Sequence, residues 1–268
     1  MIKAPILNGI DDFNGLKIHN EAIIRPSDKM PLQPIALSCG VKFNEHVPMV
    51  TYGNFMCIVG ASKSMKSFLK TTLLACYIGS NAQNLFPDIH GHNTKERFII
   101  DIDTEQSNYH VHRASKRIVE MVGSDYPYYR MFALRSITPK ERVQFIEWLY
   151  NESEYKGHIG LMSVDGVADL LENVNDLDKS NEVTQKLMSL TDLNHSAMIT
   201  VLHRNYESDK PTGHLGSAIL KKSETVVFVD KKDDVIDVKA RYTRNIPFDP
   251  FSFMVDTFGI PKQMDSIF

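Results

Sequence analysis

A short loop rich in lysine and serine stands between an apolar run and a helical pattern, and it constrains the fold more than any other feature. Residues 55–59 are all apolar and predict a buried strand, which Gly60 ends. From Lys66 onward, apolar residues recur at helical spacing as far as Ile78. The intervening loop has the sequence Gly-Ala-Ser-Lys-Ser-Met-Lys-Ser (60–67). A strand, a loop that begins with glycine and a helix in this order predict an α/β unit with a ligand site at the helix N-terminus.

Such a loop can wrap backbone N–H groups around phosphate oxygens, where the helix dipole favours negative charge. The usual phosphate-loop pattern is GxxxxGK[ST], which Gly60, Lys66 and Ser67 match. Met65 replaces the second glycine, at an energetic cost if the loop needs a positive φ there. The alternative is an ordinary lysine-rich turn with Lys63 solvated. We predict that phosphate contacts the loop and the residue after it: Gly60, Ala61, Ser62, Lys63, Ser64, Met65, Lys66, Ser67 and Phe68.

Strand and helix signals continue to alternate along the chain, which favours one large α/β domain. Helices are expected at residues 105–122, 138–150 and 177–193, and strands at 97–103, 129–134, 159–165 and 197–203. A turn-rich stretch between residues 225–229 and 235–239 predicts an antiparallel hairpin, and 252–255 predicts one more strand. The expected fold is a mostly parallel sheet flanked by helices, with a C-terminal antiparallel hairpin extension.

The N-terminal part of the chain has no such rhythm. Residues 1–47 are punctuated by Pro26, Pro31 and Pro34, and we expect an extended lead segment there. The α/β domain is then expected at residues 48–268. Residues 81–93 are expected to form a polar loop.

Composition narrows the class of protein. The 268 residues are 43% hydrophobic, enough for a sizeable core, and the net charge of −3 excludes a general attraction to nucleic acid or acidic membranes. The three cysteines form no CxxC pair, and Cys57 and Cys76 lie in apolar segments, which predicts buried thiols in a reducing compartment. Asp11 and Asp12 interrupt any signal-peptide core. We expect a cytoplasmic protein without membrane association.

Polar residues stand at the ends of three predicted strands, where ligands bind in open α/β sheets. Asp165 follows an apolar strand and is placed to hold Mg²⁺ opposite the Ser67 hydroxyl. The alternative for Asp165 is a turn aspartate before Gly166. Beyond Mg²⁺ no metal is expected, because the ten histidines show no metal-ligand spacing.

Glu105 follows the strand 97–103 and is a candidate general base, or a residue that orients an attacking water. Two alternatives stay open: Glu105 only favours the helix N-terminus, or Asp103 takes the catalytic role. Asp101 is expected to face the other side of the strand. His203 ends the strand 197–203 and is a candidate sensor of the γ-phosphate, with a purely structural histidine as the alternative.

The order of these motifs resembles the RecA-like ATPases related to DnaB-type and plasmid-encoded hexameric replicative helicases, particularly those carried on mobile elements. The similarity covers roughly residues 50–261 and includes Gly-His-Leu-Gly-Ser at 213–217. It is carried by the phosphate loop, by Ile-Asp-Thr-Glu-Gln-Ser (102–107), by Ser-Val-Asp-Gly-Val-Ala-Asp-Leu (163–170) and by Val-Leu-His-Arg-Asn (201–205).

The resemblance implies a RecA fold, ATP hydrolysis at subunit interfaces of a homo-oligomeric ring such as a hexamer, and single-stranded DNA in the ring centre. It carries over Lys66 with Ser67 as the phosphate-loop pair, Asp165 as the Mg²⁺-binding acid, Glu105 as the catalytic carboxylate and His203 as the sensor. The DNA-binding loop would be residues 204–214, which contain acidic as well as basic residues and could instead be a solvated loop. Candidates for an arginine or lysine finger are Lys221, Lys222, Arg241 and Arg244.

Three functional hypotheses follow. The first is an ATPase acting on DNA in the replication or mobilisation of a plasmid or transposon. The second is a nucleotide-dependent switch or assembly module in which Met65 marks weak or absent turnover. The third, a small-molecule kinase, is less favoured because we find no arginine-rich lid.

Overall fold

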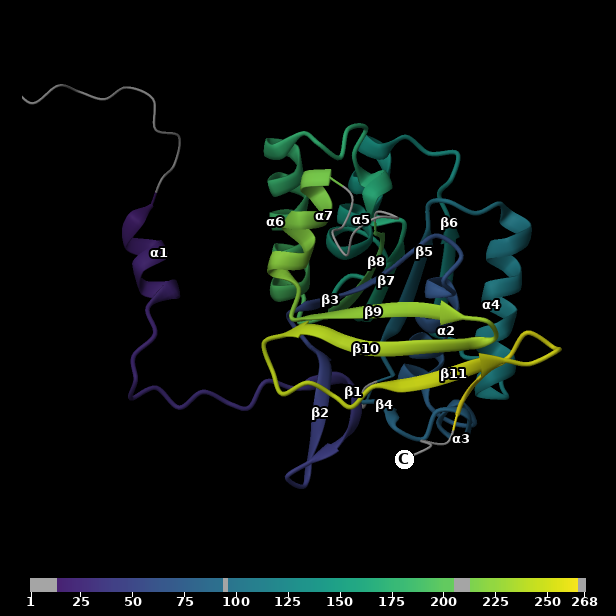
Figure 1. Ribbon diagram of the computed structural model, residues 1–268. Coiled ribbons are helices and arrows are strands. Elements are labelled where there is room, and N and C mark those ends of the chain that lie inside the picture. Colours follow the sequence, from purple (N-terminus) through teal and green to yellow (C-terminus); the bar gives the residue numbers. More distant parts are fainter. Residues whose placement is uncertain (1–13, 94–95, 205–212, 265–268) are drawn as a thin grey trace, which may run out of the picture. The chain divides into compact units, whose positions relative to one another are not determined.

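The computed structural model describes residues 14–93, 96–204 and 213–264 (Figure 1). Contacts divide the chain into two units, Met1–Gln33 and Pro34–Phe268, which we describe separately. The described part of the first unit contains the helix α1 (Gly15–Ala22), whose residues are all solvent-accessible. Asn14 caps this helix, since its side chain accepts a hydrogen bond from the Lys17 backbone N–H at 2.9 Å.

A nine-stranded sheet forms the centre of the second unit, in the order β12-β11-β10-β9-β3-β8-β7-β5-β6 (Figure 1). The strands from β9 to β6 run parallel, and β10, β11 and β12 add antiparallel. The bounds are β3 (Phe55–Gly60), β5 (Phe98–Asp103), β6 (Tyr129–Ala133), β7 (Ile159–Asp165), β8 (Ala197–His203), β9 (Thr225–Lys232), β10 (Val235–Thr243), β11 (Phe251–Val255) and β12 (Pro261–Gln263). The expected mostly parallel sheet with a C-terminal antiparallel extension is thus present.

Helices cover both faces of this sheet, and the alternation of side chains along each strand divides the core in two. Met56 and Ile58 of β3 join a cluster with α2 and α4, whereas Cys57 and Val59 join a cluster with α5, α6 and α7. The helices are α2 (Lys66–Ile78), α3 (Ala82–Leu85), α4 (Asn108–Val122), α5 (Pro139–Asn151), the short 3₁₀ helix η1 (Val167–Leu170), α6 (Leu177–Leu193) and α7 (Gly213–Lys222).

Local signals explain several of these boundaries. Thr138 and Glu141 form a capping box at the start of α5, and Pro139 takes the first helical position. The helix α4 begins at Asn108, three residues later than expected, because Asp103 first holds the chain in a turn. Residues 81–93, expected to be a loop, contain α3 and the short strand β4 (Ile89–Gly91). The three cysteines are free and buried, as expected for Cys57 and Cys76.

A second, three-stranded sheet has the order β2-β1-β4 and includes residues that we assigned to the lead segment. The strands β1 (Ile35–Lys42) and β2 (Glu45–Thr51) pair antiparallel, and Leu37, Met49 and Val50 are fully buried in the cluster with α2. The lead segment therefore ends at Gln33 by contacts, rather than at residue 47. Pro34 and Pro48 weaken the strand pattern in the sequence, but Pro48 is accommodated where the register of β1 and β2 shifts.

The strand order contains one point at which the connections between successive strands change direction. From β3 the chain passes to β5 and β6, returns through β7 and β8, and then crosses β3 to reach β9. Ligands bind at such switch points, beyond the carboxyl ends of the strands. The register aligns Gly60 with His203 and Asp103 with Asp165, so a glycine, a histidine and two aspartates meet at this edge.

Glu224, which precedes β9, ties the two sheets together. This buried carboxylate accepts a hydrogen bond from the Thr51 backbone N–H at 2.7 Å and one from the Asn245 side chain at 2.7 Å. Thr51 is the last residue of β2 and is itself buried. The contact fixes the end of the small sheet against the start of β9.

We predict that Glu224→Ala lowers the free energy of unfolding by about 2 kcal/mol, because the buried Thr51 N–H loses its acceptor. Glu224→Gln keeps one acceptor oxygen and should cost less. Urea denaturation of the three proteins measures both differences. Equal losses for the two variants would show that the charged carboxylate, rather than the side-chain volume or the single oxygen that glutamine keeps, is what matters.

Candidate functional site

Gly60 is required by close packing at the start of the loop. A Cβ atom built on Gly60 would lie 2.6 Å from the Val229 carbonyl oxygen and would also collide with the Ser64 hydroxyl. Its φ is not positive, so space rather than backbone conformation selects glycine here. The loop can therefore turn sharply between β3 and α2 and present its backbone at the helix N-terminus.

Met65 adopts the left-handed conformation that the usual second glycine would adopt without strain. Its φ is 69° and its ψ is 25°, and it is the N-cap residue of α2. The energetic cost expected from the sequence is therefore present, because a side chain in this region is strained. The side chain of Met65 is partly buried against the α2 cluster, and this packing offsets some of the strain.

Lys66 points back into the loop that precedes it. Its Nζ donates hydrogen bonds to the carbonyl oxygens of Gly60 at 3.0 Å and Ala61 at 2.6 Å. Burial lowers the pKa of Lys66 to about 8, although the charges of Asp165 and Glu105 act in the opposite direction. Ser62 and Lys63, by contrast, are exposed at the outside of the loop.

His203 connects Lys66 to Glu105. Its Nδ1 lies 3.2 Å from Lys66 Nζ, and its Nε2 lies 3.3 Å from Glu105 Oε1. The contact with His203 is the main cause that lowers the pKa of Glu105, and Lys66 contributes in the same direction. The side chains of Glu105 and His203 are 41% and 43% exposed, so both face the open edge of the sheet. The structure thus brings together the three residues predicted to be catalytic.

Asp165 lies beside Ser67, as expected for a pair that shares a cation. Asp165 is 5% exposed, and its Oδ2 has no hydrogen-bonding partner among the residues that the structure describes. Burial raises the pKa of Asp165, whereas the Lys70 ammonium and the Ser67 hydroxyl lower it. A buried carboxylate oxygen without a hydrogen-bond donor is a suitable ligand for a hard cation.

Asp103 has a structural task that distinguishes it from Glu105. Its carboxylate accepts hydrogen bonds from the backbone N–H groups of Glu105 at 2.9 Å and Gln106 at 2.7 Å, and from the Gln106 side chain at 2.7 Å. These three donors leave little capacity for a reacting water. The geometry therefore favours Glu105 over Asp103 as the candidate base.

The expectation for Asp101 was wrong. Asp101 and Asp103 are two residues apart on one strand, so both project toward the same face, and Asp101 contacts Lys70 of α2. Sequence reasoning also missed Lys70, a fully buried lysine, and Arg142, which donates hydrogen bonds to the carbonyl oxygens of Leu134 and Asp169. The position of Lys70 within the predicted buried face of α2 could have indicated that this lysine pairs with a buried carboxylate.

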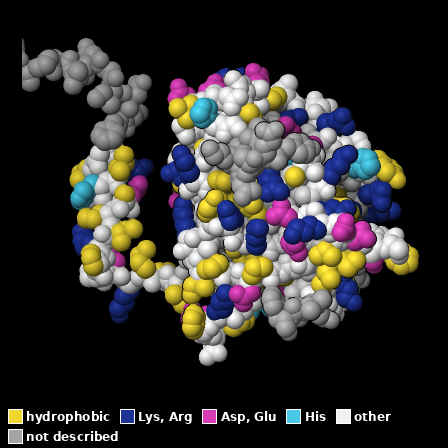
Figure 2. All heavy atoms as spheres, in the orientation of Figure 1, with side chains coloured by type: hydrophobic (Ala, Val, Ile, Leu, Met, Phe, Trp, Pro, Cys, Tyr) yellow, Lys and Arg dark blue, Asp and Glu magenta, His cyan; other side chains and the backbone are white. Residues whose placement is uncertain are grey.

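The proposed DNA-contacting loop largely lies outside the described residues, since 205–212 are not described. Arg204 at its start forms an ion pair with Asp230 at 2.7 Å. Among the finger candidates, Arg244 donates a hydrogen bond to the Lys222 carbonyl oxygen, and Arg241 lies 6.0 Å from the ring of Phe228. Figure 2 shows basic, acidic and apolar side chains interspersed on the face that carries β9, β10 and β11.

Two properties of the described chain bear on ligands and membranes. The ring of His46 lies near those of His90 and His92, with centroids 5.1 and 5.0 Å apart. Within residues 14–93, 96–204 and 213–264, however, there is no group of three or more His, Cys, Asp or Glu side chains that is placed to hold a metal ion. None of the helices in these ranges combines the length and apolar character that crossing a membrane needs.

Comparison with solved structures identifies the fold. The RadB recombinase crystal structure matches with a TM-score of 0.53 and 14% sequence identity, over 80% of this chain and 92% of that one. No family model matches the sequence. No curated protein matches it either. The chain therefore has the α/β architecture of RecA-like proteins, which confirms the fold class expected from the sequence.

We predict that Met65→Gly is more stable to unfolding than Met65→Ala by about 0.5–1 kcal/mol, because both variants lose the side chain and only glycine adopts the left-handed conformation without strain. Guanidinium denaturation of the two variants gives the difference directly. Alanine proving the more stable of the two would mean that residue 65 leaves the left-handed region in solution.

Proposed function

We propose that the protein binds ATP with Mg²⁺ at the loop of residues 60–67 and hydrolyses it. The observation that carries this proposal is the chain of contacts from Lys66 through His203 to Glu105, which lies beside the buried Asp165. A phosphate-binding lysine, a candidate sensor, a candidate base and a cation ligand are thereby gathered at the carboxyl ends of four strands.

Each residue has a distinct role in this proposal. Lys66 would exchange its hydrogen bonds with the Gly60 and Ala61 carbonyls for bonds to phosphate oxygens. The Ser67 hydroxyl and Asp165 fit Mg²⁺, because Asp165 Oδ2 is buried and no described residue forms a hydrogen bond with it. When bound there, Mg²⁺ would neutralise charge on the phosphates.

Glu105 would act on the attacking water, and His203 would control when it does so. Because Glu105 is paired with His203, a shift of His203 would release the carboxylate to act on a water. His203 also contacts Lys66, so the loss of the terminal phosphate would change the surroundings of both His203 and Glu105. Arg204 follows directly, which links this shift to the loop beyond residue 204.

We further propose that the loop 204–214 contacts single-stranded DNA and that the protein acts as a homo-oligomeric ring in replication or mobilisation of a plasmid or other mobile element. The resemblance in the order of the motifs supports this, with Arg241 or Arg244 as the residue that reaches a neighbouring subunit's nucleotide. The second candidate is a nucleotide-dependent switch with weak turnover, which the strained Met65 favours.

We predict that Lys66→Ala reduces ATP affinity at least about tenfold, because the phosphates lose a charge-assisted hydrogen-bond donor. Titration with a fluorescent ATP analogue measures the loss. Lys156→Ala, which removes an exposed lysine that precedes β7 at the other end of that strand from Asp165, is the matched control and should bind as the wild type does. Unaltered affinity of Lys66→Ala would exclude the loop as the nucleotide site.

Hydrolysis separates the two candidate functions. We predict that the wild type hydrolyses ATP with Mg²⁺, that single-stranded DNA stimulates the rate, and that Glu105→Gln binds ATP normally but loses at least about 100-fold in rate. A steady-state phosphate-release assay with and without DNA tests all three. Binding without hydrolysis under either condition would support the switch, and Met65→Gly would then show whether the strained residue is the cause.

A further inference from the structure

The strands β5 and β7 turn an unusually acidic surface toward α2. These strands are parallel neighbours, and their register aligns Asp101 with Ser163 and Asp103 with Asp165. All four side chains project to the α2 side, because the alternating residues Ile100, Ile102, Met162 and Val164 lie in the other half of the core. Three carboxylates that are at most 5% exposed therefore share one interface with a helix.

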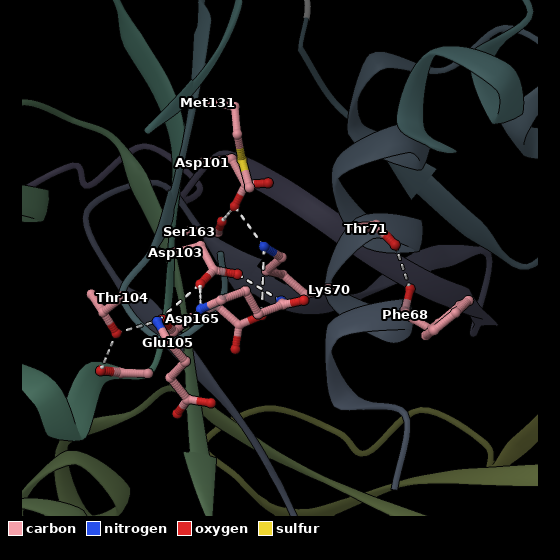
Figure 3. A network of polar contacts seen from close by, with 12 residues as sticks. Phe68, Lys70, Thr71, Asp101, Asp103, Thr104, Glu105, Met131, Ser163 and Asp165 are labelled. Carbon is pink, nitrogen blue, oxygen red and sulfur yellow. Dashed lines mark hydrogen bonds and ion pairs between the residues drawn. The ribbon is translucent and has the colours of Figure 1, made fainter. Parts of the chain in front are cut away.

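One buried amine lies among these carboxylates. Lys70 of α2 is 0% exposed, and its Nζ lies 2.8 Å from Asp101 Oδ1 but 3.6 Å from Asp165 Oδ2 (Figure 3). Lys70 lies four residues after Lys66 and three residues after Ser67 on α2, so it lies on the same side of the helix as each of them. The helix that begins at the phosphate loop thus carries a second lysine behind the candidate Mg²⁺ ligands.

The carboxylates differ in how completely their oxygens are engaged. Asp103 accepts three hydrogen bonds from the turn that follows it. Asp101 accepts from Lys70, from the Ser163 hydroxyl and from Tyr129 at 3.1 Å. Within the described part of the chain, Asp165 Oδ2 has no hydrogen-bonding partner and only the longer ion pair with Lys70. The Lys70 ammonium therefore forms a hydrogen bond with Asp101, whereas it lies too far from Asp165 Oδ2 to form one there.

We propose that Asp101 and Lys70 are positioning residues: Asp101 holds Lys70 away from Asp165 and thereby sets how strongly Asp165 attracts Mg²⁺. This inference rests on the proposed function, because it assigns Asp165 to the metal. The ammonium and the metal compete for the same carboxylate oxygen, and a lysine bonded directly to Asp165 would have to be displaced before a cation could bind. Asp101 reduces this competition by offering the ammonium a better-placed partner.

The two partners of the buried pair should therefore have opposite effects. Asp101→Asn removes the charge that holds the ammonium, so Lys70 turns toward Asp165 and Mg²⁺ binds more weakly. Lys70→Met combined with Asp101→Asn removes the competitor altogether and leaves the same net charge in the cluster, so Mg²⁺ binds more tightly. A lysine and aspartate that only pack the interface would not shift metal binding in opposite directions.

The test is the Mg²⁺ concentration needed for half-maximal binding of a fluorescent ATP analogue to the full-length protein. We expect Asp101→Asn to raise this concentration by about threefold to tenfold and the double variant to lower it by a similar factor, since one charge contact of this length is gained or lost. Direct binding of Mn²⁺ without a nucleotide, followed by the paramagnetic resonance of the free ion, should rank the variants in the same order of metal affinity. Thr72→Val alters a buried hydroxyl of α2 that forms no hydrogen bond with the described residues, and it serves as the packing control.

Circular dichroism and thermal unfolding establish that each variant is folded. If Asp101→Asn does not fold because its lysine is left uncompensated, the double variant, which buries no unpaired lysine, still decides the question. An unchanged or higher Mg²⁺ requirement in the double variant would overturn the inference while leaving the nucleotide site intact. A wild-type protein that binds the nucleotide without any dependence on Mg²⁺ would instead overturn the metal assignment of Asp165 on which the inference rests.

Discussion

The buried ion pair between Lys70 and Asp101 is the constraint around which the site is arranged. Burying charges in a protein interior is costly unless they are paired and hydrogen-bonded, and here the ammonium also faces Asp165. The pair fixes α2 against β5 and β7 at the depth where the helix leaves the phosphate loop. The positions of Lys66 and Ser67 therefore depend on a contact one helical turn further along the same helix.

The topology of the sheet supplies the remaining side chains without long loops. Because β3, β5, β7 and β8 are parallel, their carboxyl ends meet at one edge, and each ends in or just before a residue of the site. Asp103 shapes the turn after β5 so that Glu105 projects toward His203 at the end of β8. The parallel sheet thus brings the strand ends together, and short turns that follow the strands orient the side chains of the site.

Much of this could be predicted from the sequence, because periodic patterns and strand-end residues are local signals. The bounds of α2, α6 and β8 agree with the expected ones, and the positive φ of Met65 follows from the place it takes in the loop. The roles of Glu105, Asp165 and His203 stay predictions. What the sequence could not supply were pairings between distant segments. The strands β1 and β2 are stabilised by burial against α2, although Pro34 precedes β1 and Pro48 lies within β2. Lys70 and Asp101 likewise pair across the contact between α2 and the sheet.

The far edge of the large sheet has a consequence for how copies of this protein can associate. The strand β12 is short, it begins with Pro261, which has no backbone N–H to donate, and it pairs only with β11 in the described part of the chain. Short edge strands with proline discourage the unwanted edge-to-edge pairing that leads to aggregation. We therefore expect any contact between subunits there to be formed by side-chain surfaces, rather than by a backbone ladder that continues from one molecule to the next.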